Sequence, residues 1–133
     1  MGDGLRVLIV DDEPMVGKRL TPALAKIGCE VEFFFDPVAA LHRLDEQEFD
    51  VVVTDIRMSN VDGIQILKRV RERSSRTKVI IITGYAMMSL AREAMKLGAF
   101  DFIAKPFKPD ELREIVASAG EALAGSPSPG GSS

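Results

Sequence analysis

Five short apolar runs, separated by segments with helical spacing, constrain the fold of this chain more than any other feature. Each run is unbroken and rich in Val, Ile or Phe, which is typical of strands that are buried on both faces of a parallel sheet. The runs lie at residues 5–10, 31–35, 51–54, 78–82 and 100–103.

The segments between these runs carry apolar residues three or four positions apart, which is the spacing of one helix face. Gly28 lies just beyond the first segment and is a natural C-terminal stop, whereas Pro22 falls inside it and should kink the helix. The fifth segment opens at Pro109 and runs to about Leu123. The apolar positions are Val16, Leu20, Leu24 and Ile27; Val38, Leu41 and Leu44; Ile64, Leu67 and Val70; Leu90, Ala94 and Leu97; and Leu112, Ile115 and Val116.

Strands that alternate with helices in this way predict an α/β domain, in which helices cover both faces of a parallel sheet. Right-handed crossovers leave few topologies, and the flavodoxin-like (βα)5 doubly wound sheet with strand order 2-1-3-4-5 is the common five-stranded one. A length of 133 residues suits one such domain. We expect it to occupy residues 1–123, followed by a flexible Gly/Ser/Pro tail or linker at 124–133.

Bulk composition disfavours several classes of function. The formal net charge is −3, whereas a nucleic-acid-binding domain normally carries a basic patch. The apolar runs are far too short to cross a bilayer, and no signal peptide is visible. Cys29 is the single cysteine, so an internal disulfide is impossible, and we expect the protein to function in a reducing compartment. We therefore expect a cytoplasmic chain that contacts neither nucleic acid nor membrane.

Polar residues that could bind a ligand or take part in a reaction follow the predicted strands. Asp11 and Asp12 come directly after the first strand, and Asp55 follows the third. Thr83 ends the fourth strand, and the fifth leads into Lys105. In a doubly wound sheet ligands bind at the carboxyl ends of the strands, near the point where the winding reverses. We therefore expect three acids, a hydroxyl and a lysine to converge on one edge of the sheet.

This combination of groups favours phosphoryl transfer. Three carboxylates at close quarters repel one another, and a hard divalent cation such as Mg²⁺ relieves that repulsion. Lys105 adds a second positive charge that can contact an anion. A metal, an ammonium group, a hydroxyl and one free carboxylate suit the transfer of a phosphoryl group to that carboxylate, because aspartate is a known nucleophile in such chemistry.

The set Asp11-Asp12, Asp55, Thr83 and Lys105-Pro106, each at the end of its strand, resembles the response-regulator receiver domains of bacterial two-component systems. The resemblance covers roughly residues 5–123. It implies that Asp55 is the phosphoacceptor and that Mg²⁺ is held by Asp11, Asp12, Asp55 and the backbone carbonyl of Arg57. It also implies that Thr83 hydrogen-bonds the phosphoryl oxygens and that Lys105 pairs with the phosphate.

The same resemblance implies a conformational switch. Phe102, three residues before the lysine, matches the aromatic switch position of the family. Thr83 would move toward the phosphate and Phe102 would rotate inward, reshaping the surface of the fourth helix, fifth strand and fifth helix. The implied partners are a sensor histidine kinase, a downstream effector and a second copy of the chain in a phosphorylation-dependent dimer. The domain would assist its own phosphorylation and dephosphorylation without being an enzyme in the usual sense.

The loop after Asp55 departs from the usual family pattern. Ser59 stands where many members have Pro, and Asn60 where Gly is common. We expect a more mobile loop than usual with no loss of a proposed ligand side chain. Val61-Asp62-Gly63 then resumes the usual pattern.

Other functions remain open at this point. A pseudo-receiver would use the same fold only for binding or dimerisation, although the intact acid set argues against it. A haloacid-dehalogenase-type phosphatase needs a second Asp where this chain has Arg57, and two acids in the first loop would repel a flavin phosphate. Taken singly, Asp11 and Asp12 are also good helix caps, and Asp55 and Thr83 are ordinary turn residues.

Overall fold

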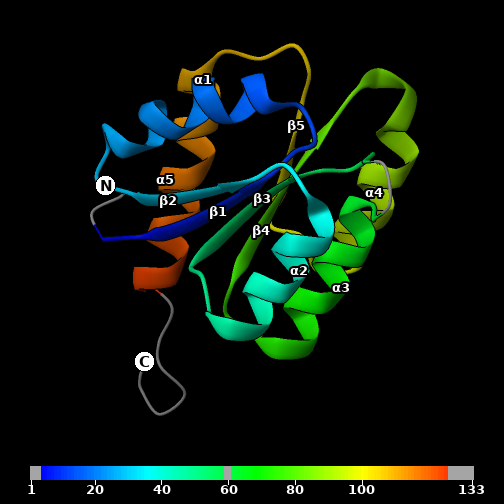
Figure 1. The fold of residues 1–133 in the computed structure, drawn as a ribbon, viewed down its shortest axis with the longest axis horizontal. Helices are drawn as coiled ribbons and strands as arrows, with labels where there is room; N and C mark the ends of the chain where they lie inside the picture. The colour runs from blue at the N-terminus through cyan, green and yellow to red at the C-terminus, as the bar shows by residue number, and fades with distance from the viewer. Residues whose placement is uncertain (1–3, 59–60, 126–133) are drawn as a thin grey trace.

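The computed structural model describes residues 4–58 and 61–125, which form a five-stranded parallel sheet with helices on both faces (Figure 1). The strand order is β2-β1-β3-β4-β5, so the predicted flavodoxin-like topology is confirmed. The proposed mobile loop at Ser59 and Asn60 lies outside the described residues. The strands are β1 (Arg6–Val10), β2 (Glu30–Phe34), β3 (Val51–Asp55), β4 (Lys78–Thr83) and β5 (Asp101–Ala104).

The helices divide between the two faces of the sheet. Helices α1 and α5 cover one face, and α2, α3 and α4 cover the other, as Figure 1 shows. A short 3-10 turn, η1 (Tyr85–Met87), precedes α4. The helices are α1 (Pro14–Ala25), α2 (Pro37–Glu46), α3 (Gly63–Arg73), α4 (Met88–Lys96) and α5 (Pro109–Gly125). No helix within the described residues is both long enough and apolar enough to cross a membrane.

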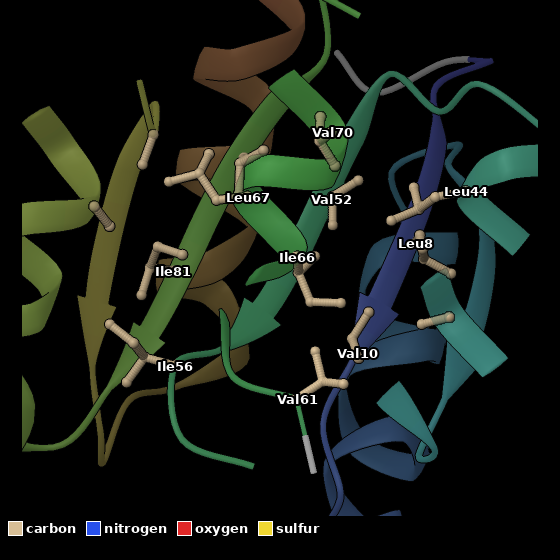
Figure 2. Close-up of a cluster of buried hydrophobic side chains, with 14 of the residues drawn as sticks. Leu8, Val10, Leu44, Val52, Ile56, Val61, Ile66, Leu67, Val70 and Ile81 are labelled. Carbon is tan, nitrogen blue, oxygen red and sulfur yellow. The ribbon is translucent and has the colours of Figure 1, made fainter. Parts of the chain in front are cut away.

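The core lies on both sides of the sheet because successive strand residues point to opposite faces. Leu8 of β1 packs under α2 and α3, whereas its neighbour Ile9 packs under α1 and α5. Figure 2 shows the first of these clusters, in which Ile66 and Leu67 of α3 lie over the strands. A strand buried on both faces has no polar side to display, which explains its unbroken apolar sequence.

Local sequence signals explain some helix ends and not others. Asp36 caps α2 through its carboxylate, which accepts a 3.0 Å hydrogen bond from Val38 N–H. Pro22 lies inside α1, and the helix continues beyond it to Ala25. Gly28 adopts a positive φ of 92°, a conformation that favours glycine over residues with a Cβ.

The last helix is longer than expected. It was predicted to end near Leu123 and instead extends to Gly125. Ala124 is a strong helix former and favours this extension, and Gly125 is the last residue of the helix. The remainder of the predicted tail, residues 126–133, lies outside the described residues.

Candidate functional site

The parallel register brings the carboxyl ends of the strands to one edge of the sheet. Val10 pairs with Thr54 across β1 and β3, and Thr83 pairs with Ala104 across β4 and β5. Asp11, Asp55 and Lys105 therefore stand at the same edge, as the sequence pattern predicts.

Three carboxylates gather at the β1 and β3 ends. One ligand oxygen from each of Asp11, Asp12 and Asp55 lies within 4.8 Å of the others. Asp11 and Asp55 are buried, and Asp12 is exposed. Local backbone bonds fix the two buried groups, because Asp11 Oδ1 accepts from Glu13 N–H at 2.9 Å and Asp55 Oδ1 accepts from Arg57 N–H at 3.2 Å.

The second carboxylate oxygen of Asp11, Oδ2, is buried without a hydrogen bond from any of the described residues. Burial, reinforced by the negative charge of Asp55, raises the pKa of the Asp11 carboxyl from 3.8 to about 6. The backbone bond from Glu13 and the charge of Lys105 oppose this rise but do not cancel it. Ionised Asp11 is thus destabilised, and the charge of Lys105 compensates for this only in part.

Lys105 supplies one positive charge to the cluster. Its Nζ lies 3.2 Å from Asp55 Oδ2, 3.3 Å from Glu13 Oε1 and 3.7 Å from Asp11 Oδ2. Burial alone would lower the pKa of Lys105, but Asp55 and Asp11 outweigh it and the pKa is raised. The ammonium group therefore stays charged beside Asp55.

Glu13 was not among the residues singled out from the sequence. Its carboxylate joins the Lys105 contacts from the exposed rim of the site. One sequence feature could have pointed to Glu13: it comes directly after the Asp11-Asp12 pair and just before the helix that begins at Pro14.

The remaining predicted residues lie on β4, on β5 and just after β3. Thr83 is fully buried at the end of β4, and its hydroxyl donates to the Gly84 carbonyl at 3.0 Å. Phe102 of β5 is half-buried and packs against the cluster under α2, α3 and α4. Arg57 follows Asp55 by two residues, and its side chain is exposed.

The donor set fits a hard divalent cation. All three acidic ligands offer oxygen atoms, and Mg²⁺ prefers one or two carboxylates together with water. Asp11 Oδ2 accepts no hydrogen bond from the described residues, so it is the kind of buried atom that a bound cation would compensate. Helix capping does not account for the acids, because α1 begins after Glu13 without any side-chain cap bond.

Comparison with known protein families shows the family to which the fold and the acidic cluster belong. Residues 7–117 match the family model of the response regulator receiver domain. The chain belongs to the response-regulator receiver family. Members of this family are signalling domains of two-component systems, with an acidic pocket that binds Mg²⁺.

Individual relatives agree with this assignment. The chain is 46% identical to the regulatory protein AtoC of Escherichia coli over 111 residues, which cover 84% of this chain and 24% of that protein. The full-length FixJ structure from B. japonicum is 36% identical with a TM-score of 0.84, covering 92% of this chain and 61% of that one. A receiver domain from Clostridium thermocellum is 30% identical with a TM-score of 0.82, covering 86% of this chain and 93% of that one. The chain thus spans about a quarter of AtoC and less than two thirds of FixJ.

Proposed function

We propose that this chain is a phosphorylation-dependent signalling switch that accepts a phosphoryl group on Asp55 with the help of Mg²⁺. The observation that carries the proposal is the meeting of Asp11, Asp12 and Asp55 within 4.8 Å, with Lys105 Nζ 3.2 Å from Asp55. In a receiver-family chain this arrangement supports phosphoryl transfer to the carboxylate that stands between metal ligands and an ammonium group.

Each residue has a separate task in this proposal. An Asp55 carboxylate oxygen forms a bond to phosphorus while the bond from phosphorus to the donor's leaving atom breaks. Lys105 neutralises charge on the phosphoryl oxygens, and the Thr83 hydroxyl can leave the Gly84 carbonyl to donate to them. Asp11, Asp12, Asp55 and the Arg57 carbonyl would hold Mg²⁺, which supplies positive charge to the transferred group.

The switch would transmit phosphorylation to the surface of α4, β5 and α5. If Thr83 turns toward the phosphate, space would open beside β5, and Phe102 would rotate into it; the half-buried position of Phe102 supports this part of the proposal. The affected surface includes Met95 and Leu97, whose side chains are exposed although apolar. It would bind an effector or a second copy of the chain, and a histidine kinase would supply the phosphoryl group in the cytoplasm.

Relatives suggest the kind of output. AtoC is named a regulatory protein and FixJ a transcriptional regulatory protein. Both are longer than this chain, so an output domain joined after α5 would suit a role in transcription. Under this proposal the domain that ends with α5 senses the phosphoryl group, and the part of the 124–133 segment that follows α5 serves as a linker.

Intact mass tests the proposal. The chain is incubated with Mg²⁺ and acetyl phosphate, beside an Asp55→Asn variant and a sample with EDTA in place of Mg²⁺. We expect one added phosphoryl group in the first sample and none in the other two. No addition in any sample, together with no binding of beryllofluoride, would instead favour a pseudo-receiver that acts only by binding.

A further inference from the structure

We propose that Gly63 is a positioning residue for the phosphoacceptor. The missing side chain lets the first turn of α3 rest directly on the backbone of Asp55 and Ile56, and this contact fixes where the Asp55 carboxylate stands. The inference rests on the proposed function, because it assigns Gly63 a task in the same site.

The approach of α3 to the strand end leaves no room for a side chain. A methyl carbon at Gly63 would lie 2.6 Å from the Asp55 carbonyl oxygen and 2.8 Å from the Ile56 Cα. Ordinary contact begins near 3.4 Å, so α3 and the Asp55 backbone would have to separate by about 0.8 Å. Both obstructing atoms belong to the backbone, so no side-chain rotation relieves the clash.

Both partners of this contact are firmly held. The Gly63 N–H donates to the Ile56 carbonyl at 2.9 Å, and Ile56 N–H donates in turn to Ile82 of β4 at 2.9 Å. On the α3 side a capping box between Asp62 and Gln65, with bonds of 2.9 and 3.0 Å, fixes the first turn, and Ile66 in that turn is fully buried against the sheet. A displacement at Gly63 therefore cannot be absorbed locally and passes to the Asp55 backbone.

A shift of this size matters for the chemistry. Misplacing a reacting group by about 1 Å can slow an enzymatic step by about 100-fold, because in-line attack needs close alignment. The Asp55 carboxylate and the Arg57 backbone are linked by a 3.2 Å hydrogen bond, so both move with the strand end. Gly63→Ala should therefore slow phosphorylation of Asp55 by about 10-fold or more.

Gly17 provides a matched control. It is a buried helical glycine too, and a methyl carbon there would lie 2.3 to 2.5 Å from ring atoms of Phe33. That clash is with a side chain of β2, and none of its three nearest atoms belongs to Asp55 or Ile56. Gly17→Ala should lower thermal stability while leaving the phosphorylation rate within about threefold of wild type.

The experiment compares wild type, Gly63→Ala and Gly17→Ala by three measurements. These are the rate of phosphoryl incorporation from acetyl phosphate, Mg²⁺ affinity from backbone amide shifts in NMR titration, and the thermal midpoint. We expect Gly63→Ala to lose both rate and Mg²⁺ affinity, whereas Gly17→Ala loses stability alone. The inference is overturned if Gly63→Ala stays within threefold of the wild-type rate, or if Gly17→Ala is slowed equally.

A second pair of variants decides the matter if Gly63→Ala fails to fold. Asp62→Ala removes the side-chain cap that holds the first turn of α3, and Asp36→Ala, the control, removes the corresponding cap of α2. Both substitutions shorten a side chain, so neither introduces a clash. We expect a two- to fivefold slower reaction for Asp62→Ala only; equal rates for the two variants would overturn the inference. If the wild-type chain takes up no phosphoryl group, the proposed function itself is wrong, and the role of Gly63 is lost with it.

Discussion

Replacing Asp11 by Asn should stabilise the metal-free protein at neutral pH. The buried Asp11 carboxyl has its pKa raised from 3.8 to about 6, so the folded chain holds the proton more tightly than the unfolded chain does. A difference of this size corresponds to about 3 kcal/mol of folding free energy. Wild-type stability from this group is fully present below about pH 4 and is lost as pH rises through about 6.

The Asp11→Asn variant keeps the shape of the side chain and cannot ionise. It should therefore exceed wild type by up to about 3 kcal/mol at pH 8, or roughly 10 °C in thermal midpoint for a chain of this length, and by almost nothing at pH 4. Urea unfolding in the presence of EDTA, repeated at pH 4, 6 and 8, measures the difference. Added Mg²⁺ should stabilise wild type at pH 8 and leave the variant unchanged.

Asp12→Asn is the matched control for this prediction. Asp12 belongs to the same carboxylate cluster but is exposed, so its removal should change metal-free stability by less than about 0.5 kcal/mol at any pH. The reasoning is refuted if Asp11→Asn is no more stable than wild type at pH 8, or if its advantage does not depend on pH.

Three further outcomes are expected. Mg²⁺ affinity, followed by NMR titration, should weaken as pH falls below about 6, because the proton on Asp11 then competes with the metal; an affinity that is flat from pH 5 to 8 would contradict this. Lys105→Met should raise the pKa of Asp11 further, since the lysine charge lowers it. The carboxyl carbon chemical shift of Asp11, followed by NMR against pH, measures this pKa, and the same value in wild type and variant would contradict the prediction. Ile66→Ala should cost about 2–5 kcal/mol in urea unfolding, because its side chain is fully buried between α3 and the sheet; a loss below 1 kcal/mol would indicate a looser core.

The architecture could be predicted because the central strands are buried on both faces. A run such as Val51–Val53 has no exposed side, so its sequence is apolar throughout, and the first polar residues mark the strand end. The same rule predicted that the acids of the candidate site meet, since Asp11 and Asp55 occupy those ends in neighbouring strands. Helix starts at Pro37 and Pro109 were also visible, because proline suits the first turn.

Contacts between distant residues could not be predicted in the same way. Glu13 and Lys105 are far apart in the chain and meet only because β1 and β5 end at the same edge. The ion pair between Asp45 of α2 and Arg69 of α3 likewise depends on how two helices pack side by side. The tight fit of Gly63 against Asp55 could not be read from local sequence, because a glycine in the first turn of a helix is equally compatible with an exposed position.

Locating the modified residue shows whether Asp55 is the phosphoacceptor. After reaction with acetyl phosphate and Mg²⁺, borohydride reduces an aspartyl phosphate to homoserine, and trypsin then releases the peptide of residues 44–57. This peptide contains Asp45, Asp50 and Asp55, so tandem mass spectrometry can tell the three positions apart. Homoserine at position 55 alone, and only when Mg²⁺ is present, is the predicted result. Homoserine at position 45 or 50, or at none of the three, would contradict the account.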